Sequence, residues 1–148
     1  MRGDVIHFDV LGIEGVQEHL EGLKESVKKK FLRGAVAKAS RIIAKAEKAL
    51  VPVDTGTLKK SIGSRVYSKK NVAGVIGARR GFERTIGKRK LYPVFTLHLV
   101  DTGHKVKGSG KWVPGTQFRS RAYHQTRSQV EQTIRADLAE RLAKFRGW

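Results

Sequence analysis

The segment Val51-Pro52-Val53-Asp54-Thr55-Gly56-Thr57-Leu58-Lys59-Lys60-Ser61-Ile62 separates an alanine-rich helical pattern from a run of short alternating segments. Pro52 cannot continue a helix, so it ends the one that precedes it. Asp54 and Thr55 carry side-chain oxygens that accept hydrogen bonds from nearby backbone N–H groups, and Gly56 permits a backbone turn that other residues resist. The segment therefore predicts a sharp change of chain direction.

Two apolar residues of this segment, Leu58 and Ile62, lie four positions apart. That spacing places both on one side of a short helical turn, where they can enter a core. The segment holds no nucleophile with a base beside it. It is therefore interpreted as a folding joint and not as a catalytic loop.

Helical periodicity dominates the N-terminal and the C-terminal thirds of the chain. Apolar residues recur at steps of three and four between Leu32 and Leu50, which predicts a helix over about residues 28–50. A similar stripe from Tyr123 to Phe145 predicts a C-terminal helix. Near the start of the chain, residues 5–11 have strand character, and residues 13–23 predict a first helix.

The middle of the chain predicts strands. Residues 61–67 and 72–77 alternate polar and apolar side chains around a turn-forming segment, which predicts an antiparallel hairpin. Residues 91–100 are interpreted as another strand, with Pro93 near its start. The order of elements predicts a single α+β domain over residues 1–148, in which a small antiparallel sheet packs against a long helix in the N-terminal half and a C-terminal helix.

Charge is the strongest feature of the composition. The 148 residues include 31 Lys and Arg against 13 Asp and Glu, for a net charge of +18 and a pI near 10.7. Between Lys59 and Arg121 there are sixteen basic residues and two acidic ones, so the excess lies in the middle of the chain. A surplus of this size favours a polyanionic partner, most often nucleic acid.

Two glycine-rich basic loops are expected, at about residues 78–91 and 104–118. Aromatic residues in them are few, so they favour phosphate contact without base readout. Loops that face acidic proteins or solvent remain an alternative. The candidate contacts to DNA or to a protein partner are Arg79, Arg80, Arg84, Lys88, Arg89, Lys90, Lys105, Lys107 and Lys111.

No catalytic, cofactor or metal site is predicted. Gly108-Ser109-Gly110-Lys111 departs from a phosphate-binding loop, because Trp112 stands where Ser or Thr should follow the lysine. His98, Asp101 and His104 could present metal ligands, and Glu83 with Asp101 could hold a nuclease's metal ion, but nothing completes either set. The chain has no cysteine, which excludes a disulfide scaffold. No secretory signal or membrane span is expected.

The segment from residue 46 to residue 62 resembles the signature of a tailed-bacteriophage family, the neck or tail-completion proteins (minor tail components, gene-product-ten-like). The family's second block is a strand that ends in an acidic residue with Gly and Thr, then a loop before the C-terminal helix. Residues 98–103 resemble that strand end with Thr and Gly reversed, and residues 113–122 resemble the start of the helix with Arg121 in place of a proline. The positions that carry the resemblance are Pro52, Asp54, Thr55, Gly56, Leu58, Ser61, Ile62, Asp101, Gly103, Pro114 and Phe118.

The resemblance implies a non-enzymatic structural protein of the virion, assembled in the host cytoplasm. Such proteins act at the head–tail junction as rings, commonly of six subunits, around the path of the DNA. The implied partners are other copies of the chain, neighbouring neck and tail proteins and, without sequence specificity, genomic DNA. The alternatives are a tail terminator that caps the tail tube, a free nucleic-acid-binding protein and a metal-dependent nuclease.

Overall fold

The structure is a computed structural model, and it describes residue 20 and residues 23–146. The strand expected over residues 5–11 lies outside the described residues, as does the helix expected over residues 13–23 apart from its two leucines. The described elements, in chain order, are α2 (Glu25–Leu50), α3 (Thr57–Ser61), β1 (Ile62–Tyr67), β2 (Ala73–Ala78), β3 (Arg84–Ile86), β4 (Arg89–Leu91), α4 (Pro93–Thr102), β5 (Gly103–Lys105), β6 (Trp112–Pro114) and α5 (Phe118–Arg146).

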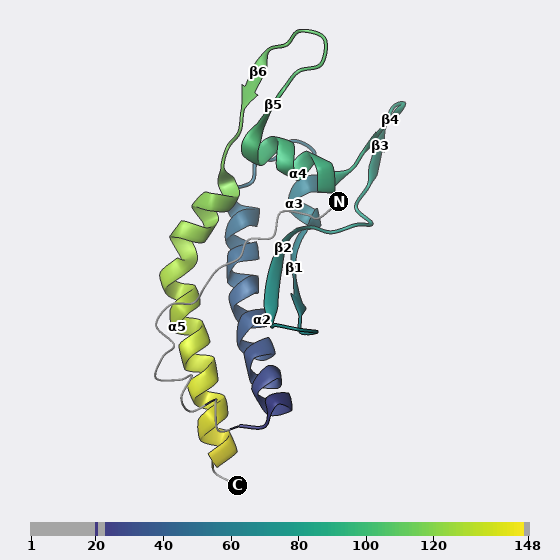
Figure 1. Cartoon of the computed structure of the whole chain (residues 1–148). Coiled ribbons are helices and arrows are strands. Elements are labelled where there is room, and N and C mark those ends of the chain that lie inside the picture. Colours follow the sequence, from purple (N-terminus) through teal and green to yellow (C-terminus); the bar gives the residue numbers. More distant parts are fainter. Residues whose placement is uncertain (1–19, 21–22, 147–148) are drawn as a thin grey trace.

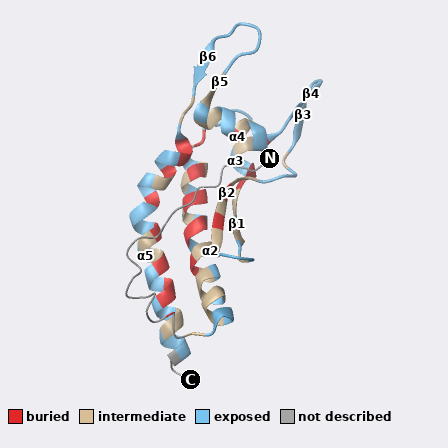
Figure 2. Ribbon diagram, viewed as in Figure 1, coloured by how far each residue is buried: buried red, intermediate tan, exposed pale blue. Residues whose placement is uncertain are grey.

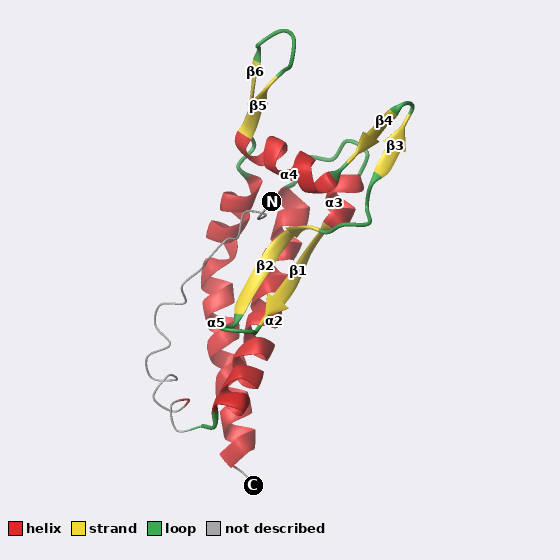
Figure 3. Cartoon of the chain, turned by 45° about the vertical axis from the view of Figure 1, so that its right-hand side comes forward, coloured by secondary structure: helices red, strands yellow, loops and turns green. Residues whose placement is uncertain are grey.

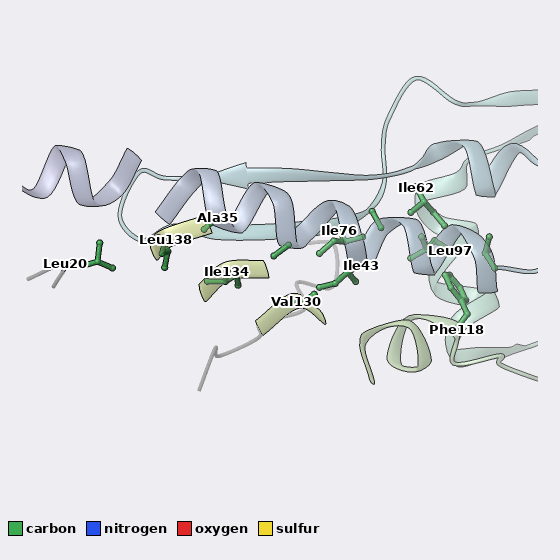
Figure 4. Packing of buried hydrophobic residues seen from close by; sticks show 13 residues of the cluster. Leu20, Ala35, Ile43, Ile62, Ile76, Leu97, Phe118, Val130, Ile134 and Leu138 are labelled. Atoms are coloured by element: carbon green, nitrogen blue, oxygen red, sulfur yellow. The ribbon is translucent and has the colours of Figure 1, made fainter. Parts of the chain in front are cut away.

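The frame of the molecule is the pair of long helices α2 and α5, which run antiparallel along its length (Figure 1). Small residues of α2, such as Ala35 and Ala39, let the two helices approach closely, and Ile134 and Leu138 of α5 are buried with them. Figure 4 shows these side chains in one cluster with residues of the joint, the first hairpin and α4. The predicted α+β fold, with a long helix and a C-terminal helix packed together, is confirmed.

An ion-pair cluster links α2 to α5 near the middle of this pair. Asp137 is 4 % exposed, and it accepts hydrogen bonds from Lys38 of α2 and, at 2.6 Å, from Arg141 of α5. Burial by itself would raise the pKa of Asp137, but the hydrogen bonds from Arg141 and Lys38 together lower it below its usual value. The carboxylate therefore stays charged and ties the two helices together.

The hairpin β1–β2 lies along α2 (Figure 3), with Ile62 opposite Ala78 and Tyr67 opposite Ala73. Gly74 of β2 sits against Ser40 of α2, and a β-carbon at that position would clash with the Ser40 hydroxyl. The strands predicted over residues 61–67 and 72–77 are confirmed to within a residue or so.

The joint after α2 has the predicted form. Val51 leaves the helix in an extended conformation, and Gly56 has φ +74°, the left-handed region that glycine adopts most readily. Within the turn, the backbone N–H of Thr57 donates to Thr55 Oγ1 at 3.4 Å. Leu58 packs against the core and Ile62 is fully buried in it, so the short turn α3 seats both apolar residues as expected.

The prediction of a strand over residues 91–100 is wrong, because most of this segment belongs to the helix α4 (Pro93–Thr102). Pro93 occupies the first turn, where its missing N–H costs nothing, and Tyr92 precedes it in an extended conformation. A short continuous apolar run does not distinguish a strand from a helix by periodicity alone. Thr96 and Thr102 each donate their hydroxyl to the carbonyl oxygen four residues earlier, which suits a helix.

The two segments expected as basic loops hold two further hairpins, β3–β4 and β5–β6, with strands of three residues each. The six strands among the described residues therefore form three separate two-stranded antiparallel sheets and not one sheet. Among the described helices, none is long and apolar enough to cross a membrane.

Candidate functional site

Both short hairpins project from the same end of the molecule, on either side of α4 (Figure 1). We call β3–β4, α4 and β5–β6 together the hairpin end. Figure 2 shows that the two hairpins are exposed over almost their whole length, whereas the buried residues gather along α2, α5 and the base of the first hairpin. The hairpin end is thus a surface that residue 20 and residues 23–146 leave open.

The hairpin end carries the predicted cationic residues. The register of β3–β4 pairs Arg84 with Leu91 and Arg89 with Ile86, so cations and apolar side chains share one face of that hairpin. The candidate contacts are exposed in the structure, six of them around β3–β4 and three on β5–β6: Arg79, Arg80, Arg84, Lys88, Arg89, Lys90, Lys105, Lys107 and Lys111.

Two of these cations also have local structural contacts. The Arg79 guanidinium lies over the ring of Phe82 at 5.0 Å, and its Nε donates to the carbonyl oxygen of Ser61 at 3.3 Å. Lys90 lies over the ring of Tyr92 at 5.4 Å. Arg79 therefore helps to fix the base of the β3–β4 hairpin as well as adding charge.

Large apolar side chains are exposed on the same surface. Of the twelve described residues of this kind that are exposed, nine belong to the hairpin end, including Phe95 at 50 % and Trp112 at 55 %. Exposed apolar surface on this scale marks a site of association with another macromolecule. The other seven are Ile86, Leu91, Tyr92, Val94, Leu99, Val106 and Val113.

The residues of the second sequence block join α4 to α5. The Asp101 side chain accepts a hydrogen bond from the backbone N–H of Arg119 at 3.1 Å, which caps the start of α5. The Asp101 carbonyl oxygen accepts another from Gln117 N–H at 2.9 Å. Phe118, at the first position of α5, is fully buried in the core. The block fixes how the β5–β6 hairpin leaves the body of the molecule.

A buried ion pair that the sequence analysis missed lies beneath this junction. Arg119 Nε is 3.6 Å from Glu47 Oε1, and Arg119 Nη2 donates to the carbonyl oxygen of Ile76 at 3.1 Å. Glu47 is fully buried, and this burial raises its pKa to about 7, although the nearby Arg119 cation opposes the shift. The signal for it was present, since Glu47 lies four residues after Ile43 on the apolar stripe of α2.

The residues considered for metal or phosphate chemistry have other roles here. Asp101 caps α5, and Glu83 accepts a hydrogen bond from Gly81 N–H in a turn that lowers the pKa of Glu83 through backbone hydrogen bonds. Gly108 and Gly110 form the tip of the β5–β6 hairpin and lead into a strand, not a helix. The part of the chain that the structure describes holds no group of three or more His, Asp or Glu placed to bind a metal ion.

Comparison with known families identifies the chain. A family model described as "Bacteriophage HK97-gp10, putative tail-component" matches residues 14–97, more than half of the sequence. The chain belongs to this HK97-gp10-like family. The match contains the joint, the first hairpin, the β3–β4 hairpin and the first half of α4, and it confirms the resemblance to phage tail components.

No curated protein and no solved structure matches the chain. Membership of the HK97-gp10-like family makes the protein a phage tail component, and so a structural constituent of the virion. The hairpin end begins inside the matched region and continues beyond it into β5–β6.

Proposed function

We propose that this protein is a non-enzymatic ring subunit at the head–tail junction of a long-tailed phage, with six copies around the path of the DNA. The observation that carries the proposal is the hairpin end. One end of the subunit presents two projecting hairpins whose cations and exposed apolar residues lie side by side. Family membership supplies the setting in which such a surface has partners.

The exposed apolar residues support assembly. Phe95 and Leu99 lie on α4 and are half exposed, and Trp112 stands out on β6. A monomeric protein gains nothing from this exposure, whereas a ring subunit buries it against neighbours. Isolated two-stranded hairpins are marginal in water, so contact with a neighbour would also stabilise them.

The cations support a position beside DNA. Arg84, Arg89 and Lys107 are exposed on strands or tips that reach away from the body. Lys and Arg on such supports neutralise phosphates whatever the base sequence, which a channel for a whole genome requires. The same cations could also bind acidic surfaces on adjoining neck or tail proteins.

The proposal is tested by removing the gene from the phage and examining the particles by electron microscopy. We expect full heads and tails of normal length that fail to join, and joining in the extract when purified protein is added. In joined particles, labelled protein should lie at the neck. Normal joined virions in the absence of the protein would overturn the proposal.

The same particles separate the proposal from its nearest alternative. A tail terminator caps the tail tube, so its loss leaves polymerisation unchecked and yields tails of irregular length. Tails of uniform length therefore support a subunit of the junction. Tails that grow without limit would assign the protein to the tube end instead.

A further inference from the structure

An open apolar cavity lies where the joint meets α4. Its volume is about 320 Å³, which is at the small end of the roughly 300–1,000 Å³ typical of ligand pockets. Leu58, Leu91 and Val100 contribute apolar wall, and the exposed Val53 belongs to the lining as well. Among the described residues that line it, Asp54 is the single ionisable one. A cavity of this size and lining suits one large apolar side chain that arrives with a positive charge beside it.

The β5–β6 hairpin carries a side chain of this kind. Trp112 is 55 % exposed, and its indole lies over Gly103, where a β-carbon would come within 2.9 Å of Cζ2. This contact holds the ring in place on the hairpin. Lys105 is the direct cross-strand partner of Trp112, so its ammonium shares that face of the hairpin, and Lys111 is the adjacent residue.

The two features are complementary, but the chain does not bring its own together. The cavity is open and the indole is exposed in the same molecule. Within the part of the chain that the structure describes, one subunit therefore presents an exposed apolar side chain with lysines beside it and an open apolar cavity with a carboxylate beside it. A contact between different patches of identical chains is heterologous, and it generates a ring when the rotation closes.

We propose that Trp112 of one subunit inserts into the cavity between the joint and α4 of the next, with Lys105 facing Asp54 across the contact. This inference rests on the proposed ring, and it names the contact that would close it. The family match ends at residue 97, before β5–β6, so the contact is inferred for this chain from its own structure.

Single cysteines test the contact directly, because the natural chain has none. Val53→Cys and Lys111→Cys, which both keep the Trp112 side chain, are purified separately, mixed and mildly oxidised, so that any mixed disulfide must join two molecules. We expect a covalent Val53→Cys–Lys111→Cys dimer on a non-reducing gel. Lys69→Cys, in the exposed turn between β1 and β2, replaces Val53→Cys in the control mixture and should give little product.

Light scattering of cysteine-free variants provides the second readout. Trp112→Ala should raise the concentration needed for half-assembly about 30-fold, as expected for a central aromatic anchor, with an unchanged circular dichroism spectrum. Asp54→Lys should weaken assembly, and the double variant Asp54→Lys/Lys105→Asp should restore it. If the concentration needed for half-assembly is the same in the wild-type protein, in Asp54→Lys and in the double variant, the Lys105–Asp54 contact is contradicted.

The outcomes separate this inference from the ring itself. If the wild-type protein forms rings while the cysteine pair does not cross-link and Trp112→Ala assembles normally, the contact is wrong and the ring remains. If the wild-type protein stays monomeric both alone and with neck and tail components, the ring and this contact are both overturned. Cross-linking together with loss of assembly in Trp112→Ala supports the contact.

Discussion

Arg119 Nε, in the first turn of α5, lies 3.6 Å from Glu47 Oε1, in the last turn of α2, and both side chains are buried. The pair lies where the two long helices, the β1–β2 hairpin and the end of α4 meet. Arg119 Nη2 also donates to the Ile76 carbonyl oxygen of β2, and the backbone N–H of Arg119 donates to the Asp101 side chain of α4. A buried carboxylate and guanidinium at this point couple the body of the subunit to the hairpin end.

Glu47 should make stability depend on pH. Its pKa is about 7 in the folded chain against an ordinary value of 4.5, so the folded state binds the proton more tightly. The stabilising contribution is full below about pH 4.5 and is lost as the pH rises to about 7, a change on the order of 3 kcal/mol. Urea unfolding from pH 4.5 to 8 should show this decline in the free energy of unfolding.

Glu47→Gln should flatten that decline, because the amide does not titrate. Glu25→Gln, an exposed residue in the first turn of α2, is the matched control and should keep the wild-type profile. An unchanged pH dependence in Glu47→Gln would show that another group is responsible.

Asp137→Asn should loosen the α2–α5 pair. The substitution removes the negative partner of Lys38 and Arg141 while it leaves the side-chain shape almost unchanged, and we expect a loss of about 1–3 kcal/mol in the free energy of unfolding. Since the pKa of Asp137 is lowered, its contribution is present above its ordinary pKa and is lost as the pH falls through the lower folded value.

Urea titration at pH 7 measures this loss. Glu140→Gln is the control, because Glu140 pairs with Lys144 at 2.6 Å on the exposed face of the same helix. Equal destabilisation by both variants would contradict the importance of the buried position.

Gly56→Val should destabilise the joint through its backbone. Gly56 has φ +74°, and a β-carbon there would meet nothing within 4 Å, so the cost of about 1–3 kcal/mol comes from conformation and not from collision. Gly77→Val is the matched control, since its β-carbon would also be unhindered but its φ is not positive. Thermal unfolding of both variants measures the difference. Equal melting temperatures would contradict the claim that the positive φ of Gly56 causes the loss of stability.

The hairpin cations should bind duplex DNA without regard to sequence. In a salt titration, Arg84→Gln/Arg89→Gln should lower the slope of log affinity against log salt by about 0.9 for each phosphate that the variant no longer neutralises. Arg41→Gln/Lys45→Gln, which removes the same charge from the exposed face of α2, should change the slope much less. Equal effects of the two variants would mean that only net charge matters.

Local patterns in the sequence predicted the elements that depend on neighbours along the chain. The stripe from Leu32 to Leu50 predicted α2, because helical periodicity repeats within a few residues. Pro52 and Gly56 predicted the joint through their own backbone restrictions, and the alternation around residues 68–71 predicted β1–β2. For residues 91–100 the same method failed, because apolar side chains without a clear period fit either α4 or a strand.

The charge and the joint were thus determined by the sequence itself. Net charge follows from composition, and the turn follows from the backbone restrictions of Pro52 and Gly56, so neither depends on contacts with distant residues. Tertiary structure alone decided that Arg119 meets Glu47, that both basic segments rise from one end, and that the cavity beside Asp54 stays open. These relationships join residues far apart in the chain, and they exist only because α2 and α5 pack antiparallel and α4 folds across their end.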